Sequence, residues 1–179
     1  MRLVATEYLS LDGVFEEPGH WSGPYFDDQA RQFKFDELNA ADAQLLGRLT
    51  YEGFAKAWPA MEGTGDFGVK MNTMPKYVVT STLKQLDWTG SRRLDGDVQE
   101  EVRKLKAQPG RDLLLPGSGQ LFRALTGAGL IDVYRFMVHP VILGSGKRLF
   151  TEDTPKQQLR LIDTRTFSKG IVVMEYERA

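Results

Sequence analysis

Residues 112–150 have the sequence DLLLPGSGQLFRALTGAGLIDVYRFMVHPVILGSGKRLF, and this stretch decides the fold. An apolar run is followed by Pro-Gly-Ser-Gly at 116–119, by apolar residues at helical spacing, and by a second strand-like run at 133–143. The predicted order is therefore strand, glycine-rich turn, helix, strand. Such a turn lets backbone N–H groups approach a phosphate, and the next helix directs the positive end of its dipole to the same point. Glycines before helices also meet steric needs, so a plain turn remains an alternative.

Strands and helices alternate along the rest of the chain. Strands are expected at residues 2–11, 43–46, 76–82 and 89–94, and helices at 26–41, at 51–58 after the N-cap Thr50, and at 98–107 after the N-cap Asp97. Residues 62–73 are polar and glycine-rich, which predicts a flexible loop. Residues 157–167 and 171–177 are expected to pair as a hairpin around Gly170. The pattern predicts an α/β fold with a mainly parallel sheet between two helical layers and antiparallel strands at one edge.

Composition limits the possible classes of protein. The 179 residues suffice for one domain, expected over 1–179, and the net charge of −1 gives no reason to expect nucleic-acid binding. The absence of cysteine excludes disulfides, a thiolate nucleophile and a cysteine-bound zinc, and no metal site is expected. The N-terminal segment lacks a long apolar region, and no run of about eighteen apolar residues is present. A cytoplasmic protein that does not enter the membrane is expected.

Polar or glycine-bearing segments follow four of the expected strands. They are residues 11–13, 47–50, 80–82 and 116–119. In sheets of this kind, ligands bind outside the carboxyl ends of the strands. The four segments therefore predict a single ligand site at that edge of the sheet.

Several short motifs carry a family resemblance when they are taken in order. They are Ser-Leu-Asp-Gly at 10–13, residues 42–52, residues 76–83, Gly-Ser-Gly-Gln-Leu at 117–121, Leu-Ile-Asp at 130–132 and residues 140–150. Together they resemble the dihydrofolate-reductase-like superfamily, and above all the reductase domain of bacterial riboflavin-biosynthesis deaminase-reductases in a stand-alone form. The resemblance implies a three-layer α/β/α fold and a homodimer. It also implies an NADPH-dependent reductase that transfers a hydride to a small imine, carbonyl or heterocycle, such as the ribosylamino-pyrimidine of riboflavin synthesis.

The resemblance also implies which residues hold the cofactor. The residues implied for the adenosine-side phosphates are Gly47, Arg48, Thr50, Thr80, Ser81 and Thr82, and those implied for the pyrophosphate are Gly117, Ser118, Gly119, Gln120 and Leu121. The guanidinium of Arg48 suits a 2′-phosphate because it is planar and permanently charged, although Arg48 could instead pair with Glu52. The family's Gly-Gly pair is Gly117-Ser118 here, and the arginine-rich segment that grips a substrate phosphate has no match. The substrate therefore remains open.

Two questions of role remain open in the sequence. Asp12 ends the first strand and is the candidate for a proton relay to the reduced substrate, although an Asp before Gly13 is also typical of a plain turn. A dihydrofolate or pteridine reductase is an alternative activity. A nucleotide-binding regulatory protein without turnover is an alternative of another class.

Overall fold

One mixed sheet organises the part of the chain that the structure describes. A computed structural model describes residues 1–61 and 64–179. Within these residues eight strands lie in the order β4-β3-β2-β5-β1-β6-β8-β7. The strands are β1 (Arg2–Ser10), β2 (Ala41–Gly47), β3 (Lys76–Val79), β4 (Ser91–Leu94), β5 (Asp112–Leu115), β6 (Val133–His139), β7 (Leu159–Thr166) and β8 (Val172–Arg178).

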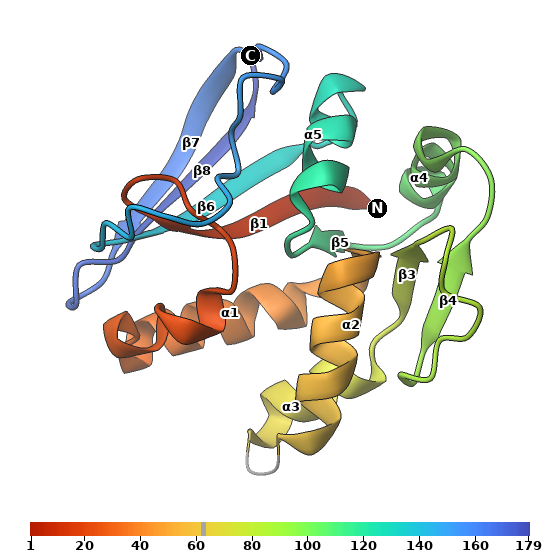
Figure 1. Cartoon of the computed structure of the whole chain (residues 1–179), viewed down its shortest axis with the longest axis horizontal. Coiled ribbons are helices and arrows are strands. Elements are labelled where there is room, and N and C mark those ends of the chain that lie inside the picture. Colours follow the sequence, from red (N-terminus) through yellow and green to blue (C-terminus); the bar gives the residue numbers. More distant parts are fainter. Residues whose placement is uncertain (62–63) are drawn as a thin grey trace.

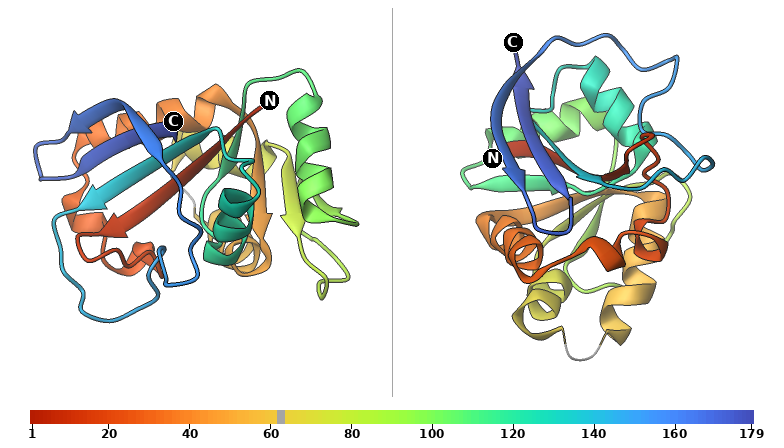
Figure 2. Two further views of the ribbon diagram at one scale, coloured as in Figure 1. Left: turned by 90° about the horizontal axis from the view of Figure 1, so that it is seen from above. Right: turned by 90° about the vertical axis from the view of Figure 1, so that its left-hand side faces the viewer.

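The sheet is parallel from β4 to β6 and antiparallel beyond β6. Strands β1, β2, β3, β4, β5 and β6 pair in parallel wherever they are neighbours. Strand β8 runs antiparallel to β6, and β7 antiparallel to β8, so the expected C-terminal hairpin is confirmed. Figure 2 shows this hairpin continuing the sheet beyond β6.

Helices cover both faces of the sheet (Figure 1). The α-helices are α1 (Asp28–Ala40), α2 (Arg48–Ala57), α3 (Gly65–Thr73), α4 (Val98–Ala107) and α5 (Gly119–Gly127), and the short 3-10 helices are η1 (Pro18–His20), η2 (Gly23–Tyr25) and η3 (Trp58–Ala60). Helices α1, α2 and α3 lie on one face and α4 and α5 on the other. The predicted α/β/α layering is therefore confirmed. No helix in the described ranges is long and apolar enough to span a bilayer.

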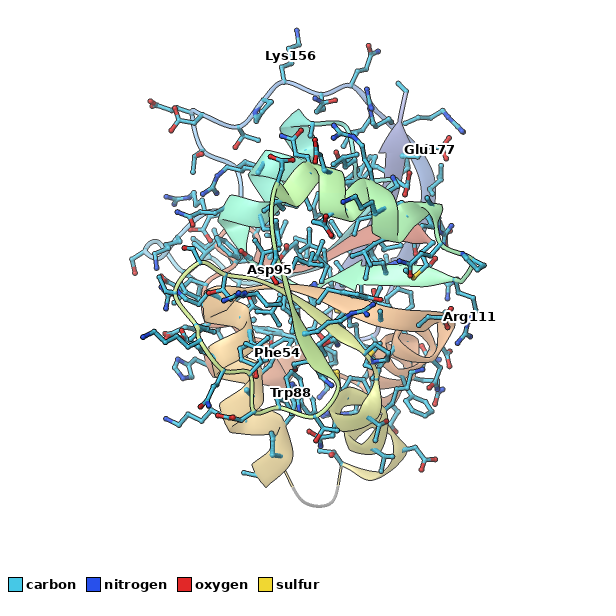
Figure 3. The ribbon with its side chains drawn as sticks, turned by 90° about the vertical axis from the view of Figure 1, so that its right-hand side faces the viewer. Phe54, Trp88, Asp95, Arg111, Lys156 and Glu177 are labelled. Atoms are coloured by element: carbon cyan, nitrogen blue, oxygen red, sulfur yellow. The ribbon has the colours of Figure 1, made fainter. Side chains whose placement is uncertain are left out.

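Alternation along the strands supplies apolar side chains to the cores on both faces of the sheet. Leu3 and Ala5 of β1 pack with Phe122 of α5, whereas Val4 packs in the second core with Leu38 of α1. The period of two residues along a strand sends successive side chains to opposite faces. Residues 3–5 of β1 present apolar side chains to both faces for this reason, as expected for a central parallel strand. The second core continues to the edge at β4, where the rings of Phe54 and Trp88 meet with centroids 6.4 Å apart (Figure 3).

Two sequence predictions about local structure are wrong. The expected loop at 62–73 contains helix α3, because Met71 is buried in the core of the α1–α3 face and Phe67 packs against it. This burial outweighs the low helix propensity of its glycines, while residues 62–63 of the expected loop lie outside the described residues. Thr50 is not an N-cap, because α2 begins at Arg48 directly after the N-cap Gly47. The first turn of α2 therefore follows β2 without a connecting loop.

Lys76 is a buried cation with a structural role at the amino end of β3. It is 0% exposed, and its Nζ donates to the carbonyl oxygens of Asn72, Met74 and Thr89 at 3.1, 2.8 and 3.0 Å. All three ammonium protons are thereby satisfied. Lys76 lies at the opposite end of the strand from Thr80, so it does not belong to the predicted ligand edge.

Candidate functional site

A crevice is expected where β1 and β5 meet, because their connections leave for opposite faces of the sheet. The chain passes from β1 to α1 on one face and from β5 to α5 on the other. β5 ends at Leu115, which pairs with Ala5, while β1 continues beside β6 as far as Ser10. Ligands of open α/β sheets bind at such a switch point, outside the carboxyl ends of the strands.

Two glycine turns adjoin one another at this point. Gly117 has φ +90°, and a Cβ on it would lie 3.3 Å from Oγ1 of Thr50. A Cβ on Gly47 would collide with the side chain of Ser118. Gly47 is therefore required by close approach and Gly117 by its backbone conformation, and the first turns of α2 and α5 lie side by side. The sequence prediction that residues 47–50 and 116–119 come together is confirmed.

Within the described residues, the first turns of α2 and α5 differ from those of α1 and α4 in having no side-chain cap. The caps of α1 and α4 are Asp27 and Asp97. The first N–H groups of a helix have no partner within the helix, and its dipole places partial positive charge there. Two such ends side by side, approached closely through Gly47 and Gly117, form a cradle suited to a phosphate or pyrophosphate.

The other predicted phosphate ligands lie on the rim of α2 and on the turn after β3. Arg48 lies on the exposed rim of α2, and its Nη1 is 2.9 Å from Oε2 of Glu52, so the alternative pairing of Arg48 with Glu52 is present. Ser81 and Thr82 are exposed after β3, where Oγ1 of Thr80 accepts the backbone N–H of Thr82 at 3.2 Å. Because Val79 pairs with Gly47, this turn follows β3 at the same edge as the cradle.

Residues 119–121, which follow the Gly117 turn, differ in their exposure. Gly119 lies against Phe15, since a Cβ on it would be 2.7 Å from Cζ of that ring. Gln120 is exposed on the first turn of α5. Leu121 is 6% exposed and its side chain packs in the core, so only its backbone is placed to contact a ligand.

Asp12 is held by the loop after β6. Its Oδ1 accepts hydrogen bonds from Oγ of Ser10 at 2.7 Å and from the N–H of Leu143 at 3.1 Å, while its Oδ2 accepts from the N–H of Gly144 at 3.0 Å. These donors, led by Ser10, lower the pKa of Asp12 to about 2. A carboxylate held in this way carries no proton to donate near neutral pH. The geometry therefore favours the turn interpretation of Asp12 over the proton relay, which stays a prediction.

Glu7 is a site residue that the sequence reasoning missed. It is 3% exposed on β1, and its Oε2 lies 4.0 Å from the point that a Cβ on Gly117 would occupy. Burial raises the pKa of Glu7 to about 8, which favours the neutral carboxyl. One signal was present in the sequence, because Glu7 interrupts the alternating apolar series formed by Leu3, Ala5 and Leu9.

Aromatic rings pack on the face of β1 opposite to Glu7. The ring of His139, at the end of β6, lies 5.2 Å from Trp21 and 5.4 Å from Tyr8. Its Nδ1 is 2.9 Å from the carbonyl oxygen of Met137, and burial lowers the pKa of His139. The segment that contains Trp21 is thus packed onto the sheet at the end of β6.

The fold and this site define a class of protein. The whole chain is similar to dihydrofolate reductase from Enterococcus faecalis, with a TM-score of 0.65 and 18% identity over 99% of this chain and 96% of that one. It is also similar to a putative riboflavin biosynthesis protein from Shewanella sp. PV-4, with a TM-score of 0.80 and 18% identity over 100% and 99% of the two chains. The fold is therefore that of the dihydrofolate reductases and their relatives.

The family within this class is shown by the sequence. Residues 2–173 match the model of the RibD C-terminal domain, so the chain belongs to the RibD C-terminal domain family. The chain is 33% identical to the uncharacterized protein YyaP of Bacillus subtilis over 178 residues, which cover 98% of this chain and 94% of YyaP. The predicted resemblance is confirmed, and membership supports a role of the reductase type.

Proposed function

We propose that the chain is an NADPH-dependent reductase that uses the crevice between β1 and β5. The observation that carries the proposal is the pair of adjoining helix N-termini without side-chain caps, at glycines that permit close approach. The pyrophosphate would lie against the backbone N–H groups at the start of α2 and α5. A Cβ at Gly117 would fill part of this cradle, which explains why the turn needs glycine there.

The remaining residues of the edge would orient the cofactor. Arg48 would exchange its exposed contact with Glu52 for the 2′-phosphate, and the Thr80 turn would line the adenosine end. Bound NADPH would supply the hydride, and the protein would position the substrate and exclude water. We propose a small imine, carbonyl or heterocycle as substrate, of the kind that the family's riboflavin-biosynthesis reductases take.

A substrate screen tests this activity. Purified protein is mixed with NADPH and with candidate carbonyl, imine, pteridine and ribosylamino-pyrimidine compounds, and the loss of the reduced nicotinamide absorbance is followed. Turnover of at least one class is expected, and the Gly117→Val variant should be inactive with the same compound. Tight NADPH binding without oxidation across the whole panel would favour a nucleotide-binding regulator instead.

We also propose that the chain forms a homodimer. Strand β7 is an edge strand, and its side chains Leu161 and Ile162 are 50% and 40% exposed. Exposed edges tend to pair with another chain, although the register shift between Leu161 and Asp163 and the nearby charges reduce that tendency. Light scattering at micromolar concentration should give the mass of a dimer. A monomer mass would contradict the proposal.

A further inference from the structure

The carboxyl group of Glu7 is buried beside the Gly117 turn. Its neighbours on the same face of β1 are the buried side chains of Ala5 and Leu9. Its Oε1 has no hydrogen-bond partner among the described residues, and its Oε2 approaches Gly117 of the cradle. Buried polar atoms are nearly always paired, so an unpaired carboxyl oxygen beside a ligand turn needs an explanation.

No cation neutralises Glu7 within the described part of the chain. Lys34 of α1 is the charge that acts on it, but the Nζ of Lys34 is bound to Glu37 and to Oγ1 of Thr6, the latter at 3.0 Å. From β6, the strand partner of Glu7 is Phe136. Apart from the backbone amide of Gly117 and the distant charge of Lys34, the carboxyl therefore meets little that would favour its charged form.

Within the described residues, α2 and α5 add no charge that is shown to pair with Glu7. From α2, the side chain beside Gly117 is Thr50, and the first ion pair of that helix, Arg48 with Glu52, is exposed on its rim. From α5, Arg123 donates to the carbonyl oxygen of Leu149 at 3.2 Å. Burial is accordingly the main reason that the pKa of Glu7 rises to about 8, partly opposed by the backbone amide of Gly117 and by Lys34.

We propose that the crevice binds NADPH only when Glu7 is protonated, so that cofactor binding draws a proton onto this carboxyl group. This inference rests on the proposed function. A pyrophosphate at Gly117 brings negative charge next to a carboxyl that water cannot reach, and like charges at short range disfavour ionisation. The protonated carboxyl is neutral and adds no charge that would repel the pyrophosphate, so the cofactor should bind this form more tightly.

The affinity for NADPH should then depend on pH in a defined window. Below about pH 7, Glu7 should not change the dissociation constant of NADPH. Above about pH 8 the constant should rise about tenfold per pH unit, because each binding event must take up a proton. Calorimetric titration in buffers of different ionisation enthalpy should show that uptake directly. NADH should give the same slope, which separates Glu7 from titration of the 2′-phosphate.

Two substitutions at one position make the test specific. Glu7→Gln has no titratable group and should bind NADPH with no pH dependence between about pH 7 and pH 9, whereas Glu7→Asp should keep the dependence with a shifted midpoint. Should the Gln variant fail to fold, the Asp variant and proton uptake by the wild type still decide the question. Lys76, whose pKa burial lowers to about 8, lies at the opposite edge and offers no rival explanation for proton uptake linked to the cofactor.

A measurement without cofactor gives an independent readout. The folded protein should hold the Glu7 proton up to about pH 8, whereas the unfolded chain releases it near pH 4.5, so this group's contribution to stability is lost as pH rises through that window. Glu7→Gln should therefore flatten the decline of unfolding stability with pH. An unchanged decline would overturn the inference.

The outcomes distinguish this inference from the proposed function. Tight NADPH binding by the wild type with a flat pH profile and no proton uptake would overturn the role of Glu7 and leave the reductase proposal standing. No NADPH binding at any pH would overturn both. A rising dissociation constant that persists unchanged in Glu7→Gln would place the titrating group elsewhere and so refute the role of Glu7.

Discussion

Substituting Gly117 with valine is expected to abolish measurable NADPH binding while the protein stays folded. Gly117 has φ +90°, a region that a β-branched residue enters at a cost of about 1–3 kcal/mol. A Cβ would also lie 3.3 Å from Oγ1 of Thr50, within the cradle formed by α2 and α5. The added methyl groups would occupy the space through which the backbone N–H groups reach a pyrophosphate. Titration calorimetry with NADPH and circular dichroism of the variant measure the two effects.

Gly96 offers the matched control for this substitution. It has φ +102°, and a Cβ on it would meet nothing within 4 Å. Gly96→Val should therefore carry a similar backbone cost while its affinity for NADPH stays that of the wild type. A folded Gly117→Val variant that binds NADPH as tightly as Gly96→Val would show that the pyrophosphate lies elsewhere.

Substituting Arg48 with glutamine is expected to weaken NADPH binding by about tenfold to hundredfold and to leave NADH binding almost unchanged. The two cofactors differ only by the 2′-phosphate, and a charge-assisted hydrogen bond contributes about 1.5–3 kcal/mol. Arg48 is exposed at the rim of α2, where it can leave Glu52 for a phosphate. Dissociation constants for both cofactors and the melting temperature of the variant provide the measurement.

Glu52→Gln tests the same site by removing the carboxylate that pairs with Arg48. It removes the carboxylate that holds Arg48 at 2.9 Å, so NADPH should bind at least as tightly as in the wild type. A surface ion pair of this kind adds at most about 1 kcal/mol to stability, so neither variant should unfold. Equal losses of NADPH and NADH affinity in Arg48→Gln would count against Arg48 as the phosphate ligand, and the Thr80 turn would become the better candidate.

The main architecture could be predicted because its signals are local. Buried strands such as β5 and amphipathic helices such as α4, with its Asp97 cap, carry their periodicity and their caps in a few neighbouring residues. The hairpin at Gly170 carries its own turn signal. Helix α3 was missed because its glycines outweighed Phe67 and Met71 in the pattern, and only tertiary burial decides between a loop and a helix there.

The glycine turns of the candidate site could be predicted from the sequence, whereas the surroundings of its carboxyl groups could not. The glycines at 47 and 117 mark close approaches that any such turn requires, and they do adjoin in the fold. The environments of Asp12 and Glu7 depend on segments far away in sequence, since Leu143 and Gly144 bind Asp12 and Gly117 lies over Glu7. For that reason the pKa of Glu7 is raised and the pKa of Asp12 is lowered. No local sequence pattern could indicate these shifts.

The central claim, that the crevice between β1 and β5 holds a nicotinamide cofactor, is tested most directly by thermal unfolding of the wild-type protein with and without NADPH. A ligand that binds only the folded state adds about 2.7 kcal/mol at about a hundredfold excess over its dissociation constant, which raises the Tm of a chain of this size by about 5 to 10 °C. The account predicts that rise for the wild type and its loss in Gly117→Val. An unchanged Tm of the wild type at millimolar NADPH would contradict the account.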